Sequence, residues 1–564
     1  MNKLLAAGLL SAVILCCACD NRRTTDTTKD SETRNVTLLP INESQHKGIV
    51  VTTDGLAEEP ANQEAIADAA IAAPAEESYQ RIIENRFLRA SENPLSTFSI
   101  DVDAASYSNL RRMLQDGFLP PADAVRIEEM VNYFRYDYAT PTDNHPFAIH
   151  TEISDAPWNG KHKLVMIGLQ GKKISTENLP PANLVFLVDV SGSMESEDKL
   201  GLVKASLKML AGELRKNDKV SIVVYAGAAG VVLEPTSDKR KIVDALERLS
   251  AGGSTAGSAG LRLAYKTARE NFSREGNNRV IICTDGDFNV GESSDEAMER
   301  LIEKERESGV FLTVLGFGTG NYQDAKMQVL AGKGNGNHAY IDGIMEAKKV
   351  LVNEFGGTLF TIAKDVKLQV EFNPAKVRGY RLIGYENRML ADEDFNDDKK
   401  DAGELGSGHT VTALYEVIPA GVKSGFLDKP PVDALKYSVK KPAAAGQVSS
   451  GNFADELLTI KFRYKDPAGD SSRLIVHPVK DIGSGIAATS DNFRFAAAVA
   501  EFGLLLRDSE FRSGASYRQV LELGKQSKGN DDEGYRAEFL KMVETAALLS
   551  VTKEKSSTGP ASQH

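Results

Sequence analysis

Short apolar runs with almost no charge alternate with amphipathic patterns of helical period between residues 181 and 355. The runs have the length of strands, and their uniform apolarity is typical of strands that are buried on both faces of a sheet. Strand and helix in alternation predict an α/β domain with a doubly wound, mostly parallel sheet. The predicted strands are residues 184–188, 220–225, 280–283 and 311–315, and the predicted helices are residues 198–214, 241–249, 258–272 and 294–307.

The segments on either side of this domain have different patterns. Residues 79–180 mix strand-length apolar runs with a helical pattern, which predicts an N-terminal α+β region. Residues 364–480 contain many strand-length runs of β-branched and aromatic residues and predict a β-rich region. We expect a β-sandwich whose strands come from both sides of the central domain. Amphipathic patterns over residues 490–550 predict a C-terminal helical segment.

The first residues have the pattern of a bacterial export signal. A basic start is followed by an apolar run over residues 4–15, which is too short for a comfortable membrane span. Ala18 before Cys19 resembles a lipobox, in which the cysteine is diacylated and becomes the mature N-terminus. We therefore expect a lipoprotein signal peptide over residues 1–19, with Cys19 as the lipidated residue. Cys17 is an alternative lipidation site, and a plain cleaved secretory signal is the alternative to lipidation.

A polar segment follows the predicted signal. Residues 20–78 are rich in Thr, Asp, Glu, Asn and Ala and have no sustained apolar period, so they predict a flexible tether that holds the domains clear of a membrane. Asp20 follows the predicted lipidated cysteine, and in enterobacterial lipoproteins an aspartate there resembles an inner-membrane retention signal. We expect a lipid-anchored protein of the bacterial cell envelope, on the periplasmic face of the inner membrane if that sorting applies.

Charge and motif spacing exclude several classes of ligand. The formal net charge is −12 and no clustered excess of Lys and Arg stands out, which argues against nucleic acid as a partner. Gly316, Gly318 and Gly320 follow a predicted strand, but their G-x-G-x-G spacing on the last strand of the domain does not match a dinucleotide-binding loop, and we expect no bound nucleotide. The eight histidines are scattered without ligand spacing, so zinc chemistry is not indicated.

Oxygen-bearing side chains follow several of the predicted strands. The first strand of the central domain ends in Asp189, and Ser191 and Ser193 follow at alternate positions. Thr255 follows a glycine turn before a predicted helix, and Asp285 follows another strand. Ligands in open α/β sheets bind outside the carboxyl ends of the strands, so we expect the three loops to meet. A cluster that supplies only oxygen ligands suits a hard divalent cation such as Mg²⁺, with Mn²⁺ or Ca²⁺ as alternatives.

Other short motifs lack the context that would give them a function. Ser196 and Lys199 form an S-x-x-K motif, but the other motifs of penicillin-binding enzymes are missing from the sequence. Asp101 and Asp103 form a D-x-D motif without a matching lysine loop, so helix capping is the favoured interpretation. Cys283 lies in an apolar run, which predicts a buried, unreactive side chain.

The three-loop pattern resembles the metal-ion-dependent adhesion site (MIDAS) of von Willebrand factor A domains. That resemblance implies that Ser191, Ser193 and Thr255 are direct or near-direct ligands, that Asp189 and Asp285 often act through water, and that one coordination position stays open for a partner carboxylate. Segments between residues 79 and 549 are similar to the YfbK-type bacterial von Willebrand factor A lipoproteins. These segments are STFSIDVDAASY (96–107), VNYFR (131–135), LVFLVDVSGSM (184–194), TDGDFNVG (284–291), LGFGTG (315–320) and GNGNHAYID (334–342).

These observations favour a binding protein rather than an enzyme. We expect membrane-tethered, divalent-cation-dependent binding of a protein partner that offers an Asp or Glu carboxylate, in adhesion or assembly. One alternative is a metal-assisted envelope hydrolase, although no His or Glu lies among the motif residues to act as a base. The other is a metal-independent envelope assembly factor whose β and helical parts carry the interface.

Overall fold

The computed structural model describes most of the chain that follows the predicted tether. The described residues are 77–175, 177, 179–254, 257–286, 295–354, 360–400, 402–428, 453–467 and 469–557. The predicted signal peptide with Cys17 and Cys19, and the predicted tether up to residue 76, lie outside them. Among the described helices, none has both the length and the apolar character needed to cross a bilayer.

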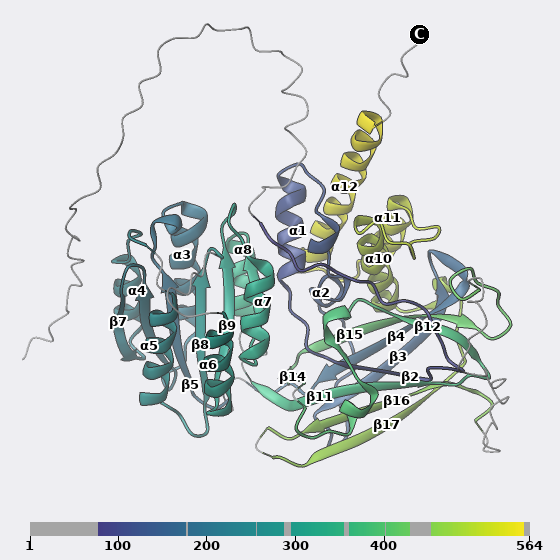
Figure 1. Ribbon diagram of the computed structural model, residues 1–564, viewed down its shortest axis with the longest axis horizontal. Coiled ribbons are helices and arrows are strands. Elements are labelled where there is room, and N and C mark those ends of the chain that lie inside the picture. The colour runs from purple at the N-terminus through teal and green to yellow at the C-terminus, as the bar shows by residue number, and fades with distance from the viewer. Residues whose placement is uncertain are drawn as a thin grey trace, which may run out of the picture. The chain divides into compact units, whose positions relative to one another are not determined.

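A six-stranded sheet of described strands lies at the centre of the central domain (Figure 1). The strand order is β10-β9-β8-β5-β6-β7, and every neighbouring pair is parallel except β6 with β7. The predicted α/β fold with a mostly parallel sheet is therefore confirmed. The strands are β5 (Ala182–Asp189), β6 (Lys219–Tyr225), β7 (Ala229–Thr236), β8 (Asn277–Thr284), β9 (Val310–Phe317) and β10 (His338–Ile341).

Helices cover both faces of this sheet because successive strand residues point to opposite sides. Leu184 and Phe186 of β5 pack against α3 and α4, whereas Val185 and Leu187 pack against α5. All four side chains are buried, as expected for strands that are apolar throughout. The helices are α3 (Leu202–Glu213), α4 (Lys239–Glu247), α5 (Gly257–Glu270), α6 (Asp295–Glu307), α7 (Asp324–Lys333) and α8 (Ile344–Lys348), and the π-helical turns are η5 (Glu197–Gly201) and η6 (Lys349–Asn353).

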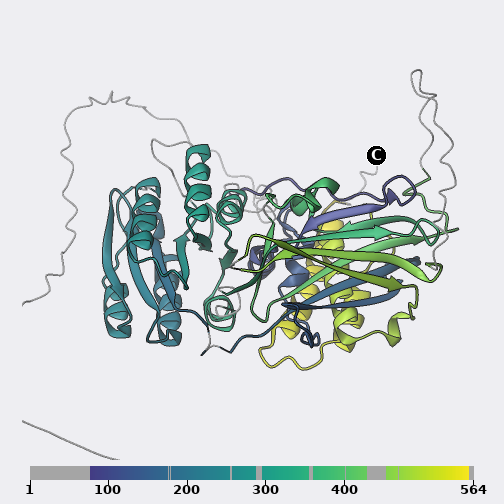
Figure 2. The ribbon, with the colours of Figure 1, turned by 90° about the horizontal axis from the view of Figure 1, so that it is seen from below.

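Two antiparallel sheets share one hydrophobic core beside the central domain. Their orders are β1-β12-β15-β4-β3 and β13-β2-β11-β16-β17, and β14 pairs with β11. Strands from before the central domain lie beside strands from after it, since β4 pairs with β15 and β2 pairs with β11 (Figure 2). This confirms the predicted sandwich-like region. The strands are β1 (Leu88–Arg89), β2 (Leu95–Ser99), β3 (Phe147–Ala156), β4 (Asn159–Gly171), β11 (Thr361–Phe372), β12 (Val377–Ile383), β13 (Met389–Leu390), β14 (Gly403–Gly406), β15 (Thr410–Pro419), β16 (Glu456–Lys465) and β17 (Ser472–Lys480).

The C-terminal helices pack with helices that precede the central domain. The aromatic ring of Phe134, which follows α2, lies 4.9 Å from that of Phe495 in α10, and the same cluster includes Phe539 of α12. The predicted C-terminal helical segment is thus confirmed. The helices are α1 (Ala105–Gln115), α2 (Ile127–Asn132), α10 (Asp491–Leu506), α11 (Tyr517–Gln526) and α12 (Tyr535–Ser557).

Candidate metal centre

Four of the five predicted metal-site residues lie at the carboxyl ends of two neighbouring strands. Asp189 is the last residue of β5, and Ser191 and Ser193 follow it in a turn that includes the 3₁₀ helix η4 (Gly192–Met194). Asp285 follows β8, which pairs with β5 in parallel. Neighbouring parallel strands bring their carboxyl ends to one edge of the sheet, which is why the two loops meet.

The fifth predicted residue, Thr255, lies outside the described residues. The glycine turn before it is described and is held against the first loop. The Gly192 N–H donates a hydrogen bond to the Gly253 carbonyl at 3.0 Å, and the Gly252 N–H donates to the Val190 carbonyl at 2.8 Å. The third predicted loop therefore reaches the same edge of the sheet.

Hydrogen bonds hold the Asp189 carboxylate in one orientation. Its Oδ1 accepts from the Ser191 N–H at 2.9 Å, and its Oδ2 accepts from the Tyr225 hydroxyl at 2.9 Å and from the Thr284 hydroxyl at 3.3 Å. Burial raises the pKa of Asp189, and the hydrogen bonds from Ser191 and Tyr225 oppose that rise. The Ser191 and Ser193 hydroxyl oxygens lie 3.0 Å apart, so two further oxygens lie beside this fixed carboxylate.

The Asp285 carboxylate is buried but has strong donors. The Lys199 ammonium donates to Asp285 Oδ2 at 2.9 Å, and the Asn321 side-chain amide donates to the same oxygen at 3.1 Å. Burial alone would raise the pKa of Asp285, but the hydrogen bonds from Lys199, Asn321 and Ser193 hold it below its usual value. Asp285 is thus favoured as a carboxylate, and Ser193 joins the two loops.

Lys199 was missed as a site residue by sequence analysis, which found it only in an S-x-x-K motif without context. It lies in η5, and its side chain is 11% exposed. Its methylene groups pass close to Gly318, which has a φ of +73°, and a Cβ atom at Gly318 would lie 2.3 Å from the Lys199 Cγ. The glycine provides the space that lets this lysine reach Asp285.

The donor set fits a hard divalent cation, since two carboxylates and two hydroxyls supply only oxygen. Among the described residues, no group of three or more His, Cys, Asp or Glu side chains could hold a metal ion, so the hydroxyls of Ser191 and Ser193 would be needed as ligands. Lys199 would have to share Asp285 with a cation. The site therefore contains its own competing positive charge.

Three family models match the chain. The model described as the C-terminal part of uncharacterized protein YfbK matches residues 357–549, a von Willebrand factor model matches residues 73–166, and a von Willebrand factor type A domain model matches residues 184–288. The uncharacterized protein YfbK of Escherichia coli (strain K12) is 44% identical over 485 residues, which cover 84% of this chain and 82% of that protein. The chain belongs to the YfbK family.

Other matches of this YfbK-family chain are more distant. The uncharacterized protein sll0103 of Synechocystis is 27% identical over 34% of this chain and 45% of that protein. A solved von Willebrand factor type A structure from Catenulispora acidiphila is 14% identical, covers 83% of this chain and 91% of that chain, and has a TM-score of 0.38. The central domain is a von Willebrand factor type A (VWA) domain, which suggests a protein-interaction or adhesion-type role.

Proposed function

We propose that this YfbK-family protein binds a protein partner through a divalent cation held at the carboxyl edge of its VWA sheet. The observation that carries the proposal is the convergence of Asp189, Ser191, Ser193 and Asp285 at the ends of β5 and β8. Thr255 belongs to the proposed ligand set by its place in the sequence. The preferred cation is Mg²⁺, with Mn²⁺ and Ca²⁺ as alternatives.

The residues of the site would have separate tasks. The Ser191 and Ser193 hydroxyls, which lie side by side, would contact the cation, and the two fixed carboxylates would hold its water ligands. When bound, the cation supplies a positive centre that accepts an Asp or Glu carboxylate oxygen from the partner. Lys199 offsets the negative charge of Asp285 and would stabilise this carboxylate before a cation binds.

Catalysis is not part of this proposal. Hydrolysis of an envelope substrate would require a general base beside the cation. The groups that hydrogen-bond to Asp189 and Asp285 include hydroxyl, amide and ammonium donors from Tyr225, Asn321 and Lys199. These donors stabilise carboxylates and favour a fixed binding site over a proton-transfer site.

We also propose that the protein is anchored in the bacterial cell envelope through a lipid on Cys19, on the periplasmic face of the inner membrane if enterobacterial sorting applies. The support is the N-terminal sequence pattern, with residues 20–78 as the tether. Inhibition of lipoprotein signal processing should leave a longer precursor, because the predicted signal peptide over residues 1–19 would remain attached. Cys19→Ala should abolish fractionation with membranes; unchanged fractionation would contradict Cys19 as the lipidated residue, and unchanged fractionation of Cys17→Ala/Cys19→Ala would contradict the lipid anchor.

Cation binding can be tested by thermal unfolding of the protein in Mg²⁺, Mn²⁺ or EDTA. At a cation concentration about a hundred times the dissociation constant, linkage predicts a stabilisation of about 2.7 kcal/mol. Asp285→Ala and Ser193→Ala should abolish that stabilisation. The matched control is Asp244→Ala, at an exposed position of α4 in the same domain. Equal stabilisation of all four proteins would contradict a cation at this site.

Partner binding needs a separate test. Proteins captured from envelope extracts by the wild type in Mg²⁺ should be lost in EDTA and lost with Ser193→Ala, because the partner carboxylate requires the cation. Capture that persists in EDTA and in the variant would instead favour the metal-independent assembly role.

A further inference from the structure

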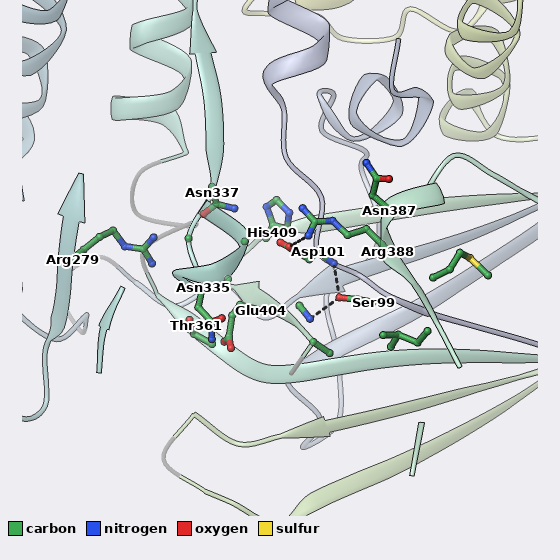
Figure 3. Close-up of a pocket in the computed structure, with 17 residues that line it drawn as sticks. Ser99, Asp101, Arg279, Asn335, Asn337, Thr361, Asn387, Arg388, Glu404 and His409 are labelled. Carbon is green, nitrogen blue, oxygen red and sulfur yellow. Dashed lines mark hydrogen bonds and ion pairs between the residues drawn. The ribbon is translucent and has the colours of Figure 1, made fainter. Parts of the chain in front are cut away.

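A second polar site lies at the opposite end of the VWA sheet from the candidate metal centre. A cavity of about 200 Å³ is lined by Arg279, near the start of β8, and by Asn337, just before β10. Its other side is formed by the antiparallel sheets, including Ser99 at the end of β2 and Thr361 at the start of β11 (Figure 3). Parts far apart in the sequence therefore enclose one cavity.

Arg279 is a buried cation that has no carboxylate partner among the described residues. The residue is 3% exposed, and its Nη1 donates one hydrogen bond to the Thr313 hydroxyl at 2.7 Å. Within the described part of the chain its Nε has no hydrogen-bond partner, and no carboxylate lies within 4.0 Å of it. Burial lowers the pKa of Arg279 to about 10, and the negative charge of Glu404 acts in the opposite direction. Figure 3 shows the guanidinium directed toward the cavity.

This arrangement contrasts with that of the other buried arginines among the described residues. A buried charge is costly unless it is paired, and an arginine cannot avoid the cost by losing its proton. Arg388, which lines the same cavity, pairs with Asp101 at 2.8 Å and with Asp103 at 3.0 Å. The other buried arginines also form ion pairs with carboxylates: Arg111, Arg112, Arg126, Arg381 and Arg507.

Additional donors face the same space. The Ser99 hydroxyl oxygen accepts hydrogen bonds from the Gly403 N–H at 2.7 Å and from the Asp101 N–H at 3.3 Å, which leaves its own proton to donate. Asn337 adds a side-chain amide to the lining. The cavity also contains the Glu404 carboxylate, which disfavours ligands of high negative charge. A small ligand with one anionic group fits these constraints best.

We infer that this cavity binds a small molecule that presents a carboxylate or phosphate oxyanion to Arg279. The ligand would complete the ion pair that the guanidinium lacks within the described residues. Charge-assisted hydrogen bonds to arginine are among the strongest that proteins make, and the planar guanidinium matches both oxyanions. Because VWA residues and antiparallel-sheet residues both line the cavity, the ligand would hold these parts of the protein together.

The test uses the full-length protein in detergent and EDTA, so that the metal site does not contribute. Sodium phosphate and sodium acetate are titrated at constant ionic strength against a chloride reference, with isothermal calorimetry and thermal unfolding as readouts. We expect at least one of the two anions to bind the wild type and to raise its unfolding temperature. Arg279→Gln should weaken that binding by at least about tenfold. Arg262→Gln, at an exposed position of α5, is the matched control and should bind as the wild type does.

A second variant covers the case in which Arg279→Gln does not fold. Gly332 lies in α7 on the cavity wall, and a Cβ atom there would have the Arg388 Nη1, 3.7 Å away, as its nearest neighbour. Gly332→Met should therefore place a side chain in the cavity while Arg279 itself is retained, and it should abolish anion binding. Gly212→Met, at an exposed position of α3, is its control. Binding of neither anion to the wild type, or unchanged binding to Gly332→Met, would overturn the inference.

Discussion

Glu501 is a buried carboxyl group in α10 whose ionisation should govern how the protein's stability depends on pH. The residue is 0% exposed, and its Oε1 accepts a hydrogen bond from the Ser516 N–H at 3.0 Å. Its Oε2 has no hydrogen-bond partner within the described residues. Burial raises the pKa of Glu501 from 4.5 to about 8, while the Ser516 hydrogen bond opposes the rise. We therefore expect the group to be protonated in the folded protein at neutral pH.

The sign of the effect follows from comparing the folded and unfolded states. Below about pH 4.5, Glu501 is protonated in both states, and its contribution to stability is fully present. Between about pH 4.5 and 8, the unfolded chain ionises this group while the folded protein does not, so stability falls as pH rises. The free energy of unfolding should fall by about 1.4 kcal/mol per pH unit, or by about 5 kcal/mol across this range.

Glu501→Gln tests this reasoning, because it removes the ionisable group while retaining a similar size and an acceptor for the Ser516 N–H. We expect the variant and the wild type to have similar stability near pH 4.5, and the variant to be more stable by about 3 kcal/mol at pH 7. Urea unfolding at pH 5, 7 and 9, followed by helical circular dichroism, measures the difference.

Glu522→Gln is the matched control, since Glu522 lies at an exposed position of the neighbouring helix α11. It should leave the pH dependence of unfolding close to that of the wild type. If Glu501→Gln and the wild type lose stability in parallel as pH rises, Glu501 does not ionise on unfolding, and the reasoning from its burial is refuted.

Three further substitutions test contacts of the candidate metal centre. Lys199→Met should raise the affinity for Mn²⁺ roughly tenfold by calorimetry, because the ammonium no longer competes for Asp285; unchanged or weaker affinity would contradict this competition. Tyr225→Phe removes a hydrogen bond to the buried Asp189 and should lower the free energy of unfolding by about 1–3 kcal/mol in urea, whereas no loss would mean that the bond contributes little. Gly318→Ala should lower the free energy of unfolding by about 1–3 kcal/mol in the same assay, because Gly318 has a positive φ and a Cβ atom there would collide with Lys199. An unchanged free energy of unfolding would show that this loop adjusts to the added methyl group.

The hydrophobic pattern predicted the four inner strands of the VWA sheet but neither of its edge strands, β7 and β10. β5 and β8 are buried along their length, and each contains a continuous apolar run, at residues 184–188 and 280–283, so their pattern was sufficient. β7 (Ala229–Thr236) was not predicted, and its burial is only intermediate along most of its length. β10 (His338–Ile341) was also not predicted as a strand, because it is only four residues long and follows a glycine-rich turn. Such strands depend on pairing with a neighbour more than on local pattern.

The part of the candidate site that lies at the ends of strands could be predicted from the sequence. Asp189 and Asp285 follow strands that the sequence reveals, so their proximity could be inferred from sheet topology. The contacts of Lys199 with Asp285 and of Tyr225 with Asp189 could not be inferred in this way. The Lys199 contact depends on the direction of a side chain from η5, and the Tyr225 contact depends on the end of β6. No local sequence pattern specifies these side-chain directions.

Buried ion pairs connect the VWA domain to the helices that precede it. Arg126, beside α2, pairs with Asp324 of α7 at 2.7 Å, and both side chains are almost fully buried. Arg111 of α1 pairs with Asp342 at 2.5 Å and with Glu346 of α8 at 2.8 Å. Separating such pairs would leave buried charges without partners, which typically costs about 3–5 kcal/mol for each. The VWA domain should therefore move together with these helices, and we expect the freedom to reach a partner to come from the predicted tether rather than from a hinge at their junction.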